Sequence, residues 1–252
     1  MKKEMELASQ KILVLGAGIS GVAAYNLLEK MGAVPILYDA NVNLGVVGLQ
    51  ERLVGGENAR IILGELKEEV RNECDMLLVS PGVPLDTEIP LWFAQHDKKI
   101  IGEIELAYLA GEGNIIAITG TNGKTTTTSL VGEIIKNYIG KAFVVGNIGI
   151  PYTEVTLQVA EGDPVVVEVS SFQLETIHEF HPHVSAILNV TPDHLNRHHT
   201  MENYTAAKKE VTKNQTEDDI CILNFDDERT RQIGAQIRAK ACYFSVEQEL
   251  DD

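Results

Sequence analysis

The sequence has little cysteine, no long apolar run and a shortage of positive charge, and each of these excludes a class of protein. Its three cysteines, Cys74, Cys221 and Cys242, are odd in number and far apart, which favours neither a disulfide framework nor a CxxC metal site. The opening residues MKKEMELASQ contain no apolar core of an export signal, and no apolar run approaches the length that spans a bilayer. We therefore expect a cytoplasmic protein with no membrane partner.

Positive charge is scarce, with 21 Lys and Arg against 37 Asp and Glu, a formal net charge of −16. This balance makes a nucleic acid an unlikely ligand class, and we expect no nucleic-acid partner. An acidic protein that binds phosphates must supply positive potential locally, from helix ends, a few lysines and divalent metal.

The 252 residues suit about two domains, and 44% apolar content is ample for buried cores.

Short apolar runs alternate with amphipathic stretches from residue 11 nearly to the end, a pattern typical of helices wrapped around mostly parallel sheets. The expected fold class is therefore α/β. Residues 103–109 have helical character, and Gly111-Glu112-Gly113 after them is the best hinge candidate. We place the boundary there, giving domains 1–111 and 112–252. The expected strands are 11–15, 34–38, 76–79, 165–169, 184–189, 220–224 and 242–245, with a helix over 19–31.

The most informative stretch is NIIAITGTNGKTTTT, residues 114–128, which reads as a buried strand, a glycine-rich turn and the start of a helix. Such a turn lets backbone N–H groups close on phosphate oxygens, while Lys124 reaches the outer phosphates and the Thr125 hydroxyl can ligate Mg²⁺. Gly120 stands only three residues before Gly123, so the loop is shorter than the usual G-x-x-x-x-G-K-[ST] pattern. The expected ATP-binding residues are Gly120, Thr121, Asn122, Gly123, Lys124, Thr125 and Thr126.

A second glycine pattern, Gly16-Ala17-Gly18-Ile19-Ser20-Gly21, lies between the first strand and the first helix, with Asp39 at the end of the next strand. Alone it suggests NAD. The physics requires only a pyrophosphate near the helix start and a ribose or base that Asp39 can hold, so a UDP group satisfies the same residues. The glycines could also serve only tight helix–strand packing.

The two nucleotide-type patterns occur together with four further blocks, and in this combination the chain resembles the Mur ligases. The phosphate loop contributes GTNGKTTTT (120–128), and the four further blocks are GNIG (146–149), EVSSFQLE (168–175), NVTPDHLNRH (189–198) and ENYTAAK (202–208). SSFQLE is most similar to the member that adds D-glutamate. The resemblance implies a Rossmann-like UDP-binding domain followed by a P-loop central domain. The L-alanine-adding relative typically has His where this chain has Asn122.

The resemblance implies an ATP-dependent amide-bond synthetase with UDP-N-acetylmuramoyl-L-alanine, ATP and D-glutamate as substrates. A substrate carboxylate attacks the γ-phosphate, and the amine of D-glutamate then displaces phosphate from the acyl phosphate. Lys124 would stabilise the β- and γ-phosphates, while Thr125 and Glu168 would hold one of two Mg²⁺ ions. The residues matching UDP-substrate positions are Gly18, Ile19, Ser20, Asp39, Ser80, Pro81, Gly82, Asn147 and Ser170. Ala40 and Asn41 follow Asp39 where some relatives carry Thr and Arg, so the chain departs from those relatives at the expected uracil contacts.

His194 and Lys208 match the remaining metal and catalytic positions. Mg²⁺ prefers oxygen ligands, so His194 could coordinate it directly, act through water, act on the acyl phosphate, or be only structural. Lys208 lies on the stripe Tyr204, Ala207, Lys208, Val211 that a helix from residue 203 would turn inward. In the family this lysine is carbamylated by CO₂; the alternative is a lysine covering an apolar helix face. His198 and His199 are expected at the surface.

The chain ends at Asp252, before the rest of the family's ATP-binding domain and its amino-acid-binding domain. The resemblance therefore implies an N-terminal fragment, monomeric and inactive alone. An NAD-type oxidoreductase is a rival that leaves the phosphate loop, Glu168, His194 and Lys208 without roles. A nucleotide-dependent switch without ligation is a second rival, and it would leave the first domain unexplained. Folylpolyglutamate synthetases share the phosphate-loop domain and the ligation chemistry, but the fingerprint domain at the start of this chain argues against them.

Overall fold

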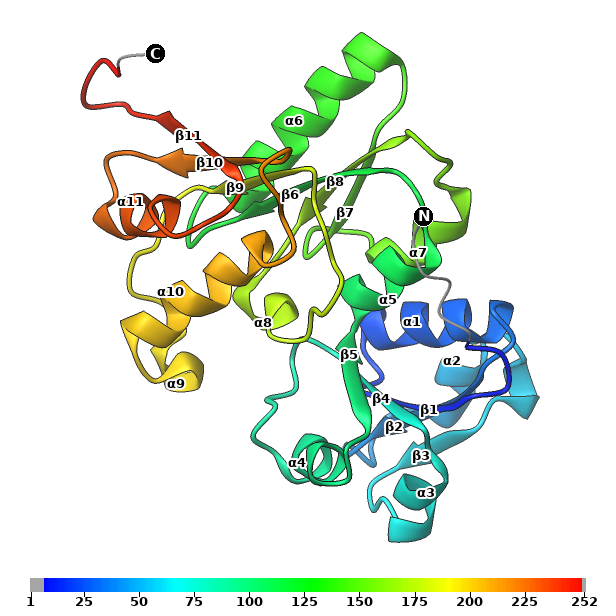
Figure 1. Cartoon of the computed structure of the whole chain (residues 1–252). Helices are drawn as coiled ribbons and strands as arrows, with labels where there is room; N and C mark the ends of the chain where they lie inside the picture. Colours follow the sequence, from blue (N-terminus) through cyan, green and yellow to red (C-terminus); the bar gives the residue numbers. More distant parts are fainter. Residues whose placement is uncertain (1–6, 251–252) are drawn as a thin grey trace. The chain divides into compact units, whose positions relative to one another are not determined.

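The computed structural model describes residues 7–250, which fold into two compact units (Figure 1). Among the described residues, the first unit contains 7–110 together with Pro151–Thr156, and the second contains Gly111–Ile150 and 157–250. The division expected at residue 111 did not include the return of Pro151–Thr156 to the first unit. No helix in the described part of the chain is long and apolar enough to cross a membrane.

The first unit is a five-stranded sheet in the order β3-β2-β1-β4-β5, with every neighbouring pair parallel. The order reverses between β1 and β4, where doubly wound sheets bind ligands beyond the carboxyl ends of the strands. Its elements are β1 (Lys11–Leu15), α1 (Ile19–Lys30), β2 (Val34–Asp39), α2 (Val46–Gln50), η1 (Gly56–Asn58), β3 (Ile61–Leu63), α3 (Glu68–Glu73), β4 (Met76–Val79), α4 (Glu88–Gln95), β5 (Lys99–Gly102), α5 (Glu103–Ala110) and α7 (Tyr152–Val155).

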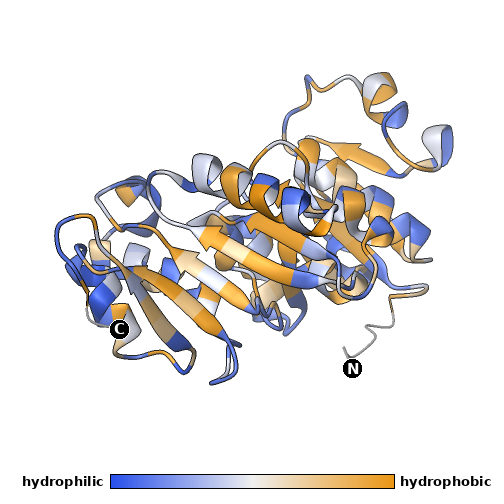
Figure 2. Ribbon diagram, turned by 90° about the horizontal axis from the view of Figure 1, so that it is seen from above, coloured by the Kyte–Doolittle hydropathy of each residue, from blue (hydrophilic) through white to orange (hydrophobic). Residues whose placement is uncertain are grey.

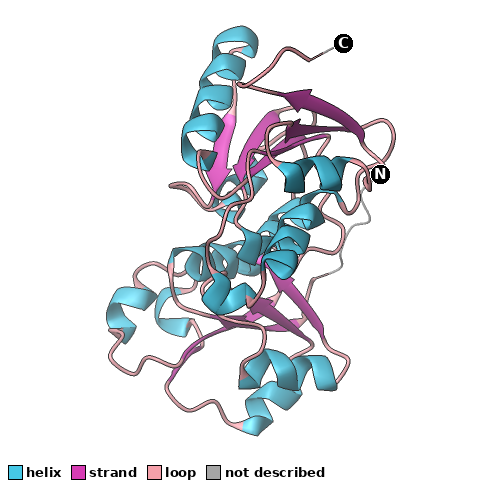
Figure 3. Cartoon of the chain, turned by 90° about the vertical axis from the view of Figure 1, so that its left-hand side faces the viewer, coloured by secondary structure: helices cyan, strands magenta, loops and turns pink. Residues whose placement is uncertain are grey.

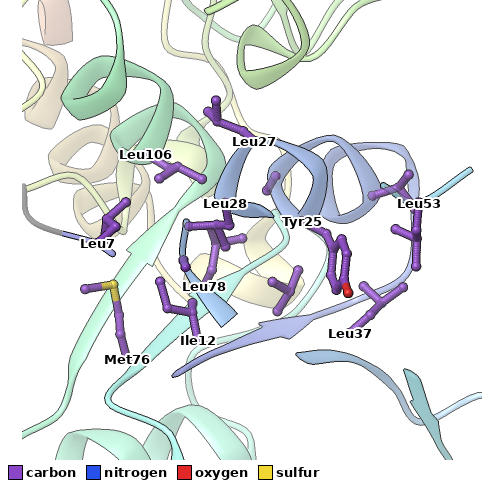
Figure 4. Close-up of a cluster of buried hydrophobic side chains, with 14 of the residues drawn as sticks. Leu7, Ile12, Tyr25, Leu27, Leu28, Leu37, Leu53, Met76, Leu78 and Leu106 are labelled. Atoms are coloured by element: carbon purple, nitrogen blue, oxygen red, sulfur yellow. The ribbon is translucent and has the colours of Figure 1, made fainter. Parts of the chain in front are cut away.

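The core of the first unit forms where α1 packs on the sheet. Figure 4 shows Tyr25 and Leu28 of α1 lying over Ile12, Leu37 and Leu78 of the strands. All five side chains are at most 1% exposed. Because parallel strands covered on both faces bury side chains on both, these strands read as continuous apolar runs. This core fixes the start of α1 against the end of β1.

The return segment Pro151–Thr156 is anchored by Glu103 of α5. The Oε1 atom of Glu103 accepts hydrogen bonds from the backbone N of Thr153 at 2.7 Å and from its Oγ1 at 2.9 Å. Glu103 is 1% exposed, and burial raises the pKa of its carboxyl group. The anchor depends on a contact between residues 50 positions apart, which explains why no local pattern predicted it.

The second unit is a six-stranded parallel sheet in the order β11-β10-β9-β6-β8-β7. Figure 2 shows that the strands of both sheets consist largely of hydrophobic residues, whereas the helices contain hydrophilic and hydrophobic residues, and Figure 3 distinguishes these strands and helices by colour. Its elements are β6 (Asn114–Thr119), α6 (Lys124–Ile139), β7 (Phe143–Gly146), β8 (Pro164–Glu168), α8 (Ser171–Leu174), β9 (Val184–Ile187), α9 (Leu195–His198), α10 (Met201–Lys209), η3 (Glu210–Thr212), β10 (Ile220–Asn224), α11 (Glu228–Gly234) and β11 (Lys240–Phe244), and η2 (Thr156–Gln158) joins it to the first unit.

The α/β fold class predicted from the sequence is confirmed, and each predicted strand and the 19–31 helix is present with ends shifted by a few residues at most. In the second unit, Val131 and Ile135 of α6 pack on Ile118 of β6 and Val166 of β8. The central strand β6 therefore directs the chain into α6 at the carboxyl edge of the sheet. The ends of β8 and β9, its two neighbours, meet the same edge.

Candidate functional site

The phosphate loop joins β6 to α6 through two glycines with left-handed φ angles, 152° at Gly120 and 84° at Gly123. A Cβ added at Gly120 would lie 3.1 Å from the Cβ of Leu188 and 3.4 Å from the backbone N of Asn189. A side chain at Gly120 would therefore press on the chain that follows β9. Gly123 is the N-cap of α6, so the loop delivers free backbone N–H groups to the positive end of a helix.

Two lysines converge on one carbonyl of this loop. The Nζ atom of Lys124 donates to the carbonyl O of Gly120 at 3.0 Å and to that of Thr121 at 2.9 Å. The Nζ atom of Lys208 donates to the same Gly120 oxygen at 2.7 Å. The loop thus concentrates positive charge in a chain whose formal net charge is −16.

Lys208 is buried, as its place on the inward-facing stripe predicted. It is 1% exposed, with its Nζ atom 4.5 Å from the centre of the Tyr204 ring. Burial, followed by the positive charge of Lys124, lowers the pKa of Lys208 to about 7, while Asp193 acts in the opposite direction. A large fraction of Lys208 is therefore a neutral, nucleophilic amine near neutral pH.

Glu168, at the carboxyl end of β8, joins two other predicted site residues. Its Oε2 atom accepts a hydrogen bond from Thr125 Oγ1 at 2.8 Å, and its Oε1 atom accepts one from Asn147 Nδ2 at 2.7 Å. The backbone N of Asn147 also donates to the Glu168 carbonyl at 2.9 Å. The Glu168 carboxylate is 1% exposed and lies beside the first turn of α6. The structure therefore brings Thr125, Glu168 and Asn147 into direct contact.

The oxygen donors of Thr125 and Glu168 suit Mg²⁺, which usually takes one or two protein oxygens and completes its shell with water and phosphate. Within residues 7–250, no group of three or more His, Cys, Asp and Glu side chains could hold a metal ion together.

His194 lies just before α9, in a left-handed conformation with φ 51°. Its Nε2 atom is 3.4 Å from Asp193 Oδ2, and its half-exposed ring has its centre 5.0 Å from that of Phe172 and 6.4 Å from that of Tyr204. The Tyr204 hydroxyl lies 3.3 Å from Thr121 Oγ1 in the phosphate loop. Tyr204 therefore connects the surroundings of His194 to the loop.

Ser170 is the N-cap of α8 and forms a capping box with Gln173. Its Oγ atom accepts from the Gln173 backbone N at 3.2 Å, and its own backbone N donates to Gln173 Oε1 at 3.0 Å. These bonds explain locally why SSFQ begins a helix immediately after β8. They also fix the Ser170 side chain, which follows Glu168 by two positions in the sequence.

Asn189 is a site residue to which no role was assigned from the sequence. Its Oδ1 atom accepts from the backbone N of Thr121 at 3.1 Å and of Asn122 at 2.9 Å, and its Nδ2 atom donates to the Asn122 carbonyl at 3.0 Å. These contacts support the loop from the strand beside β6. Its position at the end of a predicted parallel strand was the available signal, because the carboxyl ends of such strands share one edge.

His198 corrects an expectation, because it is buried rather than at the surface. It is 5% exposed, and burial, followed by the positive charge of Arg197, lowers its pKa to about 4. His199 is exposed, as predicted. The residues around His198 in the sequence are polar, and only the packing of α8 and α10 around it explains its burial.

The fingerprint loop of the first unit brings its own predicted residues together. Asp39 Oδ2 accepts from the backbone N of Ala17 at 2.9 Å, and Ser80 Oγ donates to the carbonyl O of Gly16 at 3.3 Å. A Cβ added at Gly21 would lie 1.8 Å from that same carbonyl O, so glycine is required where α1 crosses β1. Gly21 therefore permits the close approach of α1 to the end of β1, and Asp39 and Ser80 form a polar edge at the topological switch point.

Other predicted residues of this unit lie around that edge. Gly18 is the N-cap of α1, with no atom within 4 Å of an added Cβ. Ile19 is 64% exposed and Ser20 is half-buried. Pro81 and Gly82 follow Ser80 in the turn after β4. An exposed isoleucine at a helix start leaves an apolar surface beside the backbone N–H groups that would face a pyrophosphate.

Comparison with known proteins agrees with this arrangement. The profile of the Mur ligase middle domain matches residues 118–252, and that of the MurD-like N-terminal domain of Mur ligases matches residues 10–102. The chain is 51% identical to the UDP-N-acetylmuramoylalanine–D-glutamate ligase of Lachnospira eligens and 50% identical to that of Lachnoclostridium phytofermentans. These alignments cover 97% and 98% of the chain and 54% of each relative, so the chain spans about half the length of the curated relatives it matches.

Solved structures show the same fold at low sequence identity. A ligase from Neisseria meningitides, UDP-N-acetylmuramate:L-alanyl-gamma-D-glutamyl-meso-diaminopimelate ligase, aligns over 94% of this chain and 78% of its own, with 14% identity and a TM-score of 0.61. A murein peptide ligase from Psychrobacter arcticus aligns over 93% of this chain and 53% of its own, with 16% identity and a TM-score of 0.58. Since the middle-domain profile covers more than half of the chain and the N-terminal profile most of the remainder, the protein belongs to the Mur ligase family.

Proposed function

We propose that this chain supplies the UDP-substrate-binding and ATP-binding parts of a ligase that adds D-glutamate to UDP-N-acetylmuramoyl-L-alanine. The observation that carries the proposal is the contact of Thr125, Glu168 and Asn147, which puts two predicted nucleotide-site residues and one predicted substrate residue within hydrogen-bond reach. The names and identities of the relatives support D-glutamate as the amino acid added.

In this proposal the second unit positions the reacting phosphate and neutralises its charge. The backbone N–H groups of the loop bind the phosphates, and Lys124 leaves its two carbonyl partners to contact the β- and γ-phosphates. Thr125 and Glu168 would hold Mg²⁺, which supplies charge neutralisation of the phosphates when bound. Asn147 would orient the muramoyl peptide so that its carboxylate attacks the γ-phosphorus in line.

His194 would act from the edge of this site. Its half-exposed ring lies 3.4 Å from Asp193 Oδ2 and offers only nitrogen donors, whereas Mg²⁺ prefers oxygen ligands. We therefore favour a role through water or toward the acyl phosphate over direct coordination. Ser170, at the start of α8, is placed near the bound peptide in the same proposal.

Lys208 would be carbamylated in the competent enzyme. Its buried amine, with a pKa near 7, is available in the neutral form that attacks CO₂. A bond forms between Nζ and the carbon of CO₂ as one C–O π bond opens onto oxygen and the nitrogen releases a proton to water, so a neutral amine becomes an anionic carbamate beside Lys124. The product could ligate a second Mg²⁺. Mass spectrometry of the protein in bicarbonate, with Lys208→Arg as control, tests this. We expect the mass of one added carboxyl group in the wild type and not in the control. A wild type without the added mass, or a control that carries it equally, would contradict the proposal.

In the first unit, the start of α1 would hold the pyrophosphate of UDP, with Asp39 near the ribose or base and Ser80-Pro81-Gly82 beside it. Calorimetric titration of the chain with UDP-N-acetylmuramoyl-L-alanine, UDP and NADH tests this directly. We expect the muramoyl nucleotide to bind more tightly than UDP and NADH not to bind. Tight binding of NADH without binding of the muramoyl nucleotide would favour the oxidoreductase alternative. We expect the whole protein to be cytoplasmic and monomeric.

A further inference from the structure

His198 is the one buried histidine in the described part of the chain, and no role in the proposed reaction requires it. It is the last residue of α9, a single turn that begins immediately after His194. Both residues that flank this turn, His194 and His199, have positive φ angles, 51° and 66°. Such angles are unfavourable for residues other than glycine and persist where the surrounding structure holds them.

The His198 ring provides such a hold on the side of α8. Its Nε2 atom lies 2.9 Å from Ser171 Oγ, and its Nδ1 atom lies 3.5 Å from Glu175 Oε1. A carboxylate can only accept, so the favoured tautomer has its proton on Nδ1, facing Glu175, and Ser171 donates to Nε2. Both ring nitrogens are therefore used to fix the orientation of the ring.

Aromatic packing holds the same ring between α8 and α10. The ring centre lies 5.4 Å from that of Phe172 with an interplanar angle of 20°, and 5.1 Å from that of Tyr204. Arg197 reinforces the contact with α8, with its guanidinium 4.1 Å from the Phe172 ring centre and 2.7 Å from Glu175 Oε2. The three short helices α8, α9 and α10 are thus joined through one imidazole.

His194 and His198 are also joined within the turn, because the backbone N of His198 donates to the His194 carbonyl at 3.0 Å. Tyr204, which packs on both histidine rings, contacts the phosphate loop through Thr121. Any shift of the His198 ring would therefore move the backbone of His194 relative to Tyr204.

We propose that His198 is a positioning residue, which fixes the α9 turn so that His194 is held beside Phe172 and Tyr204. The proposal rests on the proposed function for the reason to place His194, but the placement itself can be measured without any ligand. His198 would act only through His194 and Tyr204 and would contact neither nucleotide nor substrate.

The test follows the ring protons of His194 by NMR in the histidine-labelled chain, with signals assigned by their loss in His194→Gln. The rings of Phe172 and Tyr204 shift these signals away from those of a free histidine. His198→Phe keeps a ring but removes both polar contacts, and Ser171→Ala removes one hydrogen bond and keeps the imidazole. His199→Asn, at the exposed residue next to His198, is the matched control.

We expect the His194 signals to move toward free-histidine values in His198→Phe and, by less, in Ser171→Ala, with no change in His199→Asn. His198→Gln, whose amide can still bond Ser171, should move them back toward wild type. Unchanged His194 signals in both test variants, with circular dichroism showing a native fold, would overturn the proposal. If His198→Phe does not fold, the His194 signals in Ser171→Ala and His198→Gln decide whether the placement of His194 depends on His198.

A second arm measures affinity for Mg²⁺ with a non-hydrolysable ATP analogue. His198→Phe should weaken it about tenfold, a loss of about 1.4 kcal/mol, with UDP affinity unchanged. Equal affinity in wild type and variant would count against a positioning role for His198. A wild-type chain that binds no nucleotide would instead contradict the proposed function, while the NMR arm still decides the placement of His194.

Discussion

Replacing Lys208 with methionine should stabilise the protein while removing the amine on which the proposed chemistry depends. Lys208 is 1% exposed, and its pKa is about 7 in the folded protein against 10.5 for a free lysine. Below pH 7 the fold must therefore keep an ammonium group in a buried site, whereas the unfolded chain exposes it to water. Methionine fills a similar volume without charge.

The magnitude follows from the pKa. Each unit by which a pKa changes is worth about 1.4 kcal/mol, so the lowered pKa of Lys208 corresponds to a cost on the order of 5 kcal/mol. Methionine gives up the bond to the Gly120 carbonyl, worth about 2 kcal/mol, although Lys124 still donates to that oxygen. We expect a net gain in the free energy of unfolding of about 2–3 kcal/mol at pH 6.

The pH dependence identifies the cause. A lysine whose pKa is lower in the folded than in the unfolded state destabilises the fold wherever the unfolded chain is charged. For Lys208 this cost is full below pH 7, falls between pH 7 and pH 10.5, and is absent above. The advantage of Lys208→Met over wild type should therefore shrink through this window.

Urea unfolding at pH 6, 8 and 9.5, followed by circular dichroism, measures the difference in the free energy of unfolding. Tryptophan fluorescence is unsuitable, because the single tryptophan, Trp92, lies in the first unit and would not report on the second. Lys209→Met is the matched control: Lys209 is half-buried on the same helix and bonded to Gln236 at 2.7 Å. A destabilised Lys208→Met variant at pH 6, or a difference from wild type that does not change with pH, would refute the reasoning.

Three further predictions concern single contacts. Lys124→Ala should weaken binding of the nucleotide triphosphate by about 3 kcal/mol, roughly a hundredfold, and leave UDP binding intact; calorimetry that found both weakened in a folded variant would contradict separate sites. Glu168→Gln should keep its bond from Thr125 but lose most of the Mg²⁺ enhancement of nucleotide binding, and an unchanged enhancement in a fluorescence titration would place the metal elsewhere. Gly21→Ala should destabilise the first unit by about 3 kcal/mol, since its Cβ would meet the Gly16 carbonyl at 1.8 Å; an unchanged Trp92 unfolding midpoint would show that α1 can move aside.

Features encoded in short stretches were predictable from the sequence. The alternation of apolar runs specified the two parallel sheets, and the glycines at 120 and 123 specified a turn that needs left-handed φ. The stripe placed Tyr204 and Lys208 on one face of the helix but left open a lysine that covers an apolar face, and their exposure of 1% each shows that both are buried. In these cases one periodicity or one conformational requirement determines the outcome.

Features that depend on contacts between distant segments were not predictable in this way. Asn189 supports the loop from 67 residues away, and Glu103 anchors Thr153 from 50 away. His198 lies in a polar stretch and is buried only because Phe172 and Tyr204 close on it. Local polarity misled the prediction there, since burial of a polar ring depends on partners that the flanking sequence does not show.

The central claim is that one chain carries two separate sites, one for a UDP-muramoyl peptide and one for Mg²⁺ with ATP. The most direct test is a calorimetric titration of UDP-N-acetylmuramoyl-L-alanine into the chain already saturated with Mg²⁺ and a non-hydrolysable ATP analogue. We predict one equivalent of each bound at the same time, with the second ligand displacing none of the first. Competition between the two ligands for a single equivalent, or failure of the muramoyl nucleotide to bind at all, would contradict the account.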